Sequence, residues 1–269
     1  MTAPRRDSVQ SLERALDLLE ALSSGRELGV TELAAAAGLP PSTVHRLLAT
    51  LTKRGYVTQN AASGRYMLGF KIVEVGSGLE HRLARLRAVA RPHLEAIQRE
   101  TGESTNLVIL DADRVVYVDQ VEGTRSVRMF TAVGTSALAH TTGSGKAIMA
   151  FGAPDDLAAR YAGREPLERL TPRTLVTLDA LRDDFVRIRR RGYAIDNEEH
   201  EEGVGCVACP VFDHTGAPVA AMSVSGPSAR ILHADTADLA ALIRRHAADT
   251  SATLGHEGST RPVAVAPDA

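Results

Sequence analysis

A tight turn, Leu39-Pro40-Pro41, lies between two short segments of helical periodicity and limits what the first part of this chain can fold into. Proline fixes its own φ and cannot continue a preceding helix. The helix before the turn is therefore expected to begin near Thr31, which can cap it, and to end at Gly38. The next helix begins near Ser42 and ends at Gly55. The sequence predicts two short helices joined by a tight turn.

The segments on either side of this pair complete a longer pattern. Residues 8–23 place apolar side chains three and four positions apart, on one face of a helix: Val9, Leu12, Leu16, Leu19 and Leu22. After the third helix, β-prone runs at 56–59 and 65–68 are joined by a loop typical of a hairpin. Three helices followed by a hairpin are the order of a winged helix-turn-helix, which we place at 8–69.

The net charge of −2 conceals an asymmetry along the chain. Residues 1–71 hold nine Lys or Arg against six Asp or Glu, whereas the rest of the chain holds 22 against 27. The stretch 42–71 contains five basic residues and no acidic one. Such a stretch indicates a polyanionic partner, although on charge alone a solvated basic face is an equally good interpretation.

The third helix can present hydroxyl and cationic groups to DNA. Its apolar side chains share one face: Val44, Leu47, Leu48 and Leu51. The opposite face offers groups that bind base edges and phosphates. We expect DNA contacts from Ser42, Thr43, His45, Arg46, Thr50, Lys53, Arg54 and, on the hairpin, Arg65. The competing interpretation is a three-helix bundle with a solvated face.

The remaining chain reads as a helical linker at 70–102, with a joint before Pro92, and a second domain at 103–254. The second domain mixes strands and helices. Strands are predicted at 104–110, 114–121, 126–131, 203–213 and 218–226, and helices at 143–151, 178–191 and 235–254. The tail 255–269 is rich in Gly, Pro and Ala and is expected to be disordered.

Three patterns in the second domain suggest catalysis or metal binding, but each lacks a necessary part. Residues 142–146 resemble a phosphate-binding loop, yet His140 and Ala147 stand where that motif needs Gly and Ser or Thr. Cys206 and Cys209 lie three apart in a strand, so they point to opposite faces, and no second cysteine pair completes a zinc site. A hydrolase that uses Cys206 or Ser223 with a histidine lacks a Gly-x-Ser-x-Gly turn. We expect no enzyme activity, no cofactor and no metal.

Several segments together resemble the IclR family of bacterial regulators. They are GVTELAAAAGLPPSTVHRLLATLTKRGYV in the first domain, and GTSALAHTTGSGKAIMAF, GYAIDNEEHEEGVGCVACPVFD and VAAMSVSGPSARI in the second. The resemblance runs from about residue 8 to 254. It implies an α+β two-domain protein with an operator-binding domain, a GAF/PAS-like α/β effector-binding domain, and assembly as a homodimer or dimer of dimers.

A small-molecule site is expected in the second domain. Ser223 and Ser225 alternate with apolar residues, so both hydroxyls face one side of a strand and need partners. Gly143-Ser144-Gly145 begins a helix, where backbone N–H groups favour an anion. The resemblance implies an effector pocket formed by Met129, Gly143, Ser144, Asp196, Cys206, Ser223 and Ser225. From the residues alone, ordinary capping and packing remain equally good explanations.

The sequence as a whole therefore predicts a DNA-binding transcriptional regulator whose affinity for double-stranded operator DNA is controlled by a small organic acid. Neither an enzyme nor a purely architectural DNA protein explains both domains. The two cysteines fit a reducing compartment, and neither a signal peptide nor an apolar run of about 20 residues is visible. We expect a cytoplasmic protein with no membrane partner.

Overall fold

The structure, a computed structural model, describes residues 9–153, 156–232 and 236–257. The chain divides into two compact units, and the boundary falls after Arg82. The predicted linker is one long helix, α4 (Lys71–Thr101), which contains this boundary. Each unit is described by itself.

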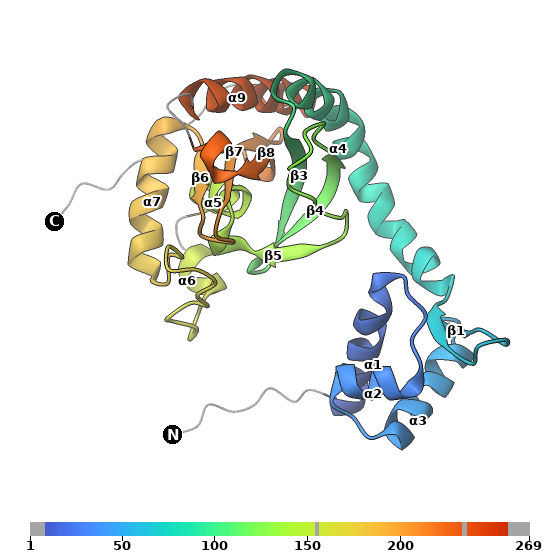
Figure 1. Ribbon diagram of the computed structural model, residues 1–269. Helices are drawn as coiled ribbons and strands as arrows, with labels where there is room; N and C mark the ends of the chain where they lie inside the picture. The colour runs from blue at the N-terminus through green and yellow to red at the C-terminus, as the bar shows by residue number, and fades with distance from the viewer. Residues whose placement is uncertain (1–8, 154–155, 233–235, 258–269) are drawn as a thin grey trace. The chain divides into compact units, whose positions relative to one another are not determined.

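The first unit consists of three helices and a hairpin (Figure 1). Its elements are α1 (Gln10–Ala21), the short 3₁₀ helix η1 (Leu22–Ser24), α2 (Val30–Ala37), α3 (Pro41–Lys53), β1 (Val57–Gln59) and β2 (Tyr66–Leu68). The two strands pair antiparallel, with Val57 opposite Leu68. The predicted order of elements is therefore present.

The turn between α2 and α3 depends on Gly38 and the two prolines. Gly38 takes a left-handed conformation, φ 62°, and Leu39 N donates to Ala34 O at 2.9 Å, which closes the end of α2. Pro41 occupies the first position of α3. A backbone N–H at this position has no partner within the helix, so proline loses no helical hydrogen bond there. The expectation that Thr31 caps α2 was wrong, because Gly29 is the N-cap and its N–H donates to Glu32 Oε2 at 2.7 Å.

Helix α1 buries only part of its apolar face. Leu18 and Leu22 are fully buried in the unit's core, and Leu19 packs against it. Val9, Leu12 and Leu16 stay 64%, 59% and 48% exposed. These three residues, called here the α1 stripe, form an apolar surface that no other described residue of the first unit covers.

Helix α4 continues through Pro92, so the predicted joint at this position was wrong. Proline removes one helical hydrogen bond, but packing around it outweighs that loss. Ala90 and Leu94 are fully buried, and Arg91 binds Asp119 of the neighbouring strand at 2.9 Å. These contacts fix the helix against the second unit on both sides of the proline.

The second unit is built on a six-stranded antiparallel sheet in the order β5-β4-β3-β8-β7-β6. Its strands are β3 (Ser104–Asp111), β4 (Arg114–Val121), β5 (Ser136–Leu138), β6 (Ala194–Asn197), β7 (Val204–Phe212) and β8 (Pro218–Pro227). The helices are η2 (Ala139–Thr141), α5 (Gly143–Phe151), α6 (Asp156–Arg160), α7 (Leu178–Arg191), α8 (Ser228–Ile231) and α9 (Thr236–Thr253).

Helices cover both faces of this sheet (Figure 1). Side chains of α5 and α7 form one core with Cys206 and Ala208 of β7. Side chains of α4 and α9 form the other with Val207 and Cys209 of the same strand. The alternation along β7 thus separates two cores, one on each face of the sheet.

The strand predicted at 126–131 is absent, because this segment has no ladder partner among the described residues. Its carbonyl groups are bonded by side chains instead: Ser104 Oγ donates to Met129 O at 2.5 Å, and Arg230 donates to Val127 O at 2.7 Å. The strands β5 and β6 and the helices α6 and α8 were not predicted. The expected disorder of the tail concerns residues that, from 258 onward, lie outside the described part of the chain.

Candidate DNA-reading surface and small-molecule site

The outer face of α3 is polar and exposed, as the sequence predicts. Val44 and Leu48 are fully buried, and Leu47 and Leu51 pack against the core. This packing turns the opposite face outward. Six of the predicted residues are exposed there, namely Ser42, His45, Arg46, Thr50, Lys53 and Arg54, while Thr43 is half-buried. The hydroxyl of Thr50 donates to Arg46 O at 3.1 Å and keeps its lone pairs for a partner.

Arg65 differs from the other predicted contacts because its side chain is engaged within the unit. Its Nε donates to Glu27 O at 3.1 Å, and its Nη2 lies 2.5 Å from Glu32 Oε2. Asn60 and Ser63 of the hairpin loop also donate to the Glu27 carboxylate, at 2.7 and 2.9 Å, and lower its pKa. These bonds hold the hairpin against α2, so Arg65 positions the wing.

Three of the predicted small-molecule residues lie in one row on the α5 face of the sheet. Asp196 lies opposite Cys206, and Cys206 lies opposite Ser225. Ser225 in turn lies opposite Ser104, whose hydroxyl holds Met129 O. Paired residues of an antiparallel ladder share a face. The row across β6, β7, β8 and β3 therefore contains Asp196, Cys206 and Ser225. Its last member, Ser104, contacts the backbone of Met129.

The start of α5 packs directly against this row. A Cβ on Gly143 would lie 3.2 Å from Cys206 Sγ and 3.3 Å from Asp196 N, so a larger residue would crowd the strand. Thr142 caps the helix by accepting from Gly145 N at 3.0 Å. The first N–H groups of a helix have no partner within it. Gly143 and Ser144 therefore bring donors to the row of Asp196 and Cys206.

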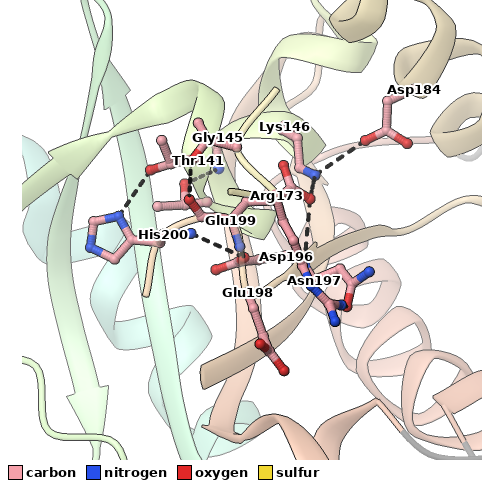
Figure 2. A network of polar contacts seen from close by, with 12 residues as sticks. Thr141, Gly145, Lys146, Arg173, Asp184, Asp196, Asn197, Glu198, Glu199 and His200 are labelled. Carbon is pink, nitrogen blue, oxygen red and sulfur yellow. Dashed lines mark hydrogen bonds and ion pairs between the residues drawn. The ribbon is translucent and has the colours of Figure 1, made fainter. Parts of the chain in front are cut away.

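Backbone N–H groups hold Asp196 beside a buried ion network (Figure 2). Its Oδ1 accepts from Glu199 N at 2.7 Å and from His200 N at 3.4 Å. Burial nevertheless raises the pKa of Asp196 to about 7. Behind it, Lys146 Nζ of α5 pairs with Glu199 and lies 3.2 Å from Asp184 Oδ2. Lys146 is thus already paired with two carboxylates, which agrees with rejecting the phosphate-loop interpretation.

Among the described residues, three polar side chains of the strands have buried atoms without a nitrogen or oxygen partner. They are both amide atoms of Asn106, Nε2 of Gln120 and Oγ of Ser223, which has the weakly bonding Cys206 thiol as a neighbour. Asn106 lies opposite Ser223 on one side and opposite Gln120 on the other, so the three are neighbours. Burying a polar group without a partner is unfavourable, and a bound polar ligand removes that penalty.

Sequence reasoning found Ser223 but missed Asn106 and Gln120. A signal was present in the sequence. Asn106 lies two residues after Ser104, on the same face of the strand, and four apolar residues follow it. What the sequence did not supply is the pairing of β3 with β8, two strands more than a hundred residues apart.

The nucleophile interpretations do not fit this geometry. Cys206 and Cys209 lie in different cores on opposite faces of the sheet, as predicted. Burial raises the pKa of Cys206 to about 11, so its thiol stays protonated near neutral pH. The nearby histidines have other partners: His140 Nε2 lies 2.9 Å from Glu168 O, and His200 Nδ1 lies 2.9 Å from Thr141 Oγ1.

A cavity of about 550 Å³ lies beside the ion network and not at the predicted row. Lys146, Glu199 and Asp184 line it together with Arg173 and Arg187, and none of the seven predicted residues does. Among the described residues, no helix is long and apolar enough to cross a membrane.

Comparison with known proteins assigns both units to one family. Residues 11–61 match the IclR helix-turn-helix domain, and residues 81–252 match the C-terminal domain of bacterial transcriptional regulators of the IclR type. The chain is 36% identical over 258 residues to the transcriptional repressor IclR of Escherichia coli, covering 94% of this chain and 93% of that protein.

Solved structures support the same family assignment. The Thermotoga maritima IclR structure is 33% identical, with a TM-score of 0.71 and coverage of 92% of this chain and 99% of that one. An IclR homologue from Microbacterium hydrocarbonoxydans, solved with 4-hydroxybenzoate, is 25% identical, with a TM-score of 0.74 and coverage of 91% and 98%. These relatives are transcriptional regulators and not enzymes, and the helix-turn-helix unit and the α+β unit are the ones this family combines. The chain belongs to the IclR family of bacterial transcriptional regulators.

Proposed function

We propose that this regulator binds operator DNA through α3 and that a small organic acid, bound between α5 and the sheet, controls its affinity for the operator. Membership of the family supports the DNA-binding part of this proposal. The unpartnered atoms of Asn106, Gln120 and Ser223 support the regulatory part. In this proposal the protein acts in the cytoplasm, where its operator lies.

On the DNA side, α3 enters the major groove with its exposed face. Arg46 and Thr50 read base edges, and Lys53 and Arg54 bind phosphates near the end of the helix. Ser42, Thr43 and His45 contact DNA at the start of the helix. Arg65 supports the wing through Glu32 and contacts a phosphate only with its outer edge, since the side chain keeps 41% of its surface exposed.

On the ligand side, a carboxylate binds at the start of α5 and a second oxygen binds the polar row. The N–H groups of Gly143 and Ser144 favour an anion. Ser223 and Ser225 then offer hydroxyls, Asn106 and Gln120 offer amides, and Met129 and Cys206 add an apolar wall. An oxygen-rich acid satisfies the unpartnered atoms, whereas a plain fatty acid leaves them unpaired.

Asp196 shapes the choice of ligand. A charged carboxylate beside an anionic ligand is repulsive, but the pKa of about 7 lets this side chain hold a proton and donate it to a ligand oxygen. Hydroxy and oxo acids supply such an oxygen. The 4-hydroxybenzoate bound by the Microbacterium relative, which carries a hydroxyl and a carboxylate, belongs to this class.

Two or four copies of the chain act together. One recognition helix covers too few base pairs for useful specificity, and symmetric dimers supply two. The α1 stripe offers an apolar surface for a second copy. Helix α4 belongs to both units, and in this proposal it transmits the change on ligand binding to the paired α3 helices.

The experiment is a thermal-shift screen of hydroxy and oxo acids on the full chain, followed by calorimetry of the best ligand. A ligand that binds only the folded protein raises its melting temperature. The double variant Ser223→Ala/Ser225→Ala is expected to lose binding, whereas Thr253→Ala, which removes an exposed hydroxyl from α9, keeps it. Equal affinity of the double variant and the wild type would place the pocket elsewhere.

A further inference from the structure

Two histidines from different helices face each other on the other side of the sheet. Nδ1 of His93 on α4 lies 2.9 Å from Nδ1 of His246 on α9, and their ring planes meet at 64°. Asp249 lies one turn after His246 on the same helix, so its carboxylate is on the same face. One ligand atom from each of the three residues lies within 4.8 Å of the other two.

This donor set suits a divalent transition metal. Imidazole nitrogens and a carboxylate are ligands of zinc, cobalt and nickel. With metal–nitrogen bonds of about 2.0–2.1 Å, two nitrogens of a tetrahedral site stand about 3.3 Å apart. The histidine nitrogens therefore need to separate by only a few tenths of an ångström. Asp249 is exposed, so its side chain is able to turn toward the ion.

A metal ion binds the lone pair of a neutral imidazole nitrogen. A neutral imidazole has one ring nitrogen with a free lone pair. In the present contact one Nδ1 donates and the other accepts, so metal binding shifts one proton from Nδ1 to Nε2.

The charged groups around the pair favour a cation on balance. Glu100 and Asp249 attract positive charge at His246, whereas Arg245 opposes it. Arg245 is 62% exposed and lies 3.3 Å from Glu100. Its Nη2 also lies 3.4 Å from His246 Nε2, a long contact that is lost when Nε2 carries the proton.

We propose that His93, His246 and Asp249 form a binding site for one divalent transition metal, with zinc as the reference ion and water as the fourth ligand. The site joins α4 to α9 across the surface of the second unit. Three protein ligands with one open position make a site that exchanges its ion more readily than a closed four-ligand site. The ion fastens the part of α4 that lies on the sheet.

The test is calorimetric titration of the full chain, free of any polyhistidine tag, with zinc chloride. Cobalt absorption spectra serve as a second readout, because intense visible bands report tetrahedral coordination. The expected result is one ion per chain, with affinity lowered more than tenfold in His93→Gln and in Asp249→Asn. His81→Gln is the matched control, since it removes an exposed histidine from the same helix and is expected to bind like the wild type.

A further variant tests the position of the ion. Arg245→Gln removes the opposing charge and the contact to His246, so it is expected to bind zinc more tightly than the wild type. Circular dichroism of all variants checks that they are folded. The proposal is overturned if the wild type takes up no zinc at 100 times the protein concentration, if His93→Gln binds as the wild type does, or if Arg245→Gln binds no more tightly.

Discussion

Asn106 of β3 and Ser223 of β8 lie directly opposite each other on the α5 face of the sheet, and among the described residues neither has a nitrogen or oxygen partner for its buried polar atoms. Two neighbouring strands thus present unsatisfied groups at one point. The start of α5 packs against Cys206, and the ladder partner of Cys206, Ser225, lies two residues along β8 from Ser223. This relationship is the main support for the proposal that a polar ligand binds here.

Replacing Asn106 with leucine tests whether these groups are kept for a ligand. Because the amide is buried and unpartnered, Asn106→Leu is expected to raise the free energy of unfolding by about 1–3 kcal/mol. The same variant is expected to lose ligand binding. Urea denaturation and calorimetry measure the two effects. Lower stability of Asn106→Leu would show that the amide has partners and would contradict this account.

Asp196 makes stability depend on pH in a direction that is unusual for a carboxyl group. Its pKa is raised from 3.8 to about 7, mainly by burial. The hydrogen bond from Glu199 N and the charge of Lys146 lower this pKa, whereas the charge of Glu199 raises it. Between these two values the folded chain binds more protons than the unfolded chain, so this group's contribution to stability falls as pH rises.

Asp196→Asn removes this loss and retains an oxygen that accepts from Glu199 N. The stability of the variant relative to the wild type is therefore expected to increase from pH 4 to pH 7 and to level off above it. Denaturation at a series of pH values measures the difference. Parallel profiles for the two proteins would mean that Asp196 is charged throughout.

Arg46 is expected to carry sequence-specific DNA binding. Its side chain is exposed on α3, between the fixed positions of Val44 and Leu48. Arg46→Ala is expected to weaken operator binding by about 1–3 kcal/mol without unfolding the unit. Arg26→Ala removes the same charge from an exposed position outside α3 and serves as the control. An unchanged mobility shift for Arg46→Ala would show that the orientation of this helix on DNA is different.

The α1 stripe is expected to lie in a contact between two copies of the chain. Leu12 and Leu16 are about half exposed or more, which is unfavourable for apolar side chains that have no cover. Leu12→Asp is expected to weaken the dimer and, with it, operator binding. Light scattering at micromolar concentration measures the mass. A monomeric wild type that binds the operator with full affinity would contradict the prediction.

The sequence predicted the elements whose signals are local. The turn at Gly38 and Pro40, the apolar face of α3 and the alternation of Ser223 and Ser225 each depend on neighbouring residues, and each has the expected place. Of the predicted pocket residues, Asp196, Cys206 and Ser225 lie in one row across the sheet, and Gly143 packs against it. For Met129 and Asp196, however, that prediction came from the resemblance to the family and not from the pattern.

Three of the failures have one physical cause, which is that tertiary contacts replaced a local preference. Residues 126–131 alternate like a strand, but Ser104 and Arg230 bind their carbonyl groups. Pro92 favours a break, but the packing of Ala90 and Leu94 keeps the helix continuous. Asn106 was missed for the same reason, since its position opposite Ser223 depends on the pairing of β3 with a strand distant in the sequence.

The most direct test of the account is release of operator DNA by the effector, measured by fluorescence anisotropy of a labelled operator duplex. The account predicts that the acid found by thermal shift changes the operator affinity of the wild type. It predicts that Ser223→Ala/Ser225→Ala binds the operator with wild-type affinity and does not respond to the acid. A double variant that responds like the wild type would contradict the central claim that this pocket controls DNA binding.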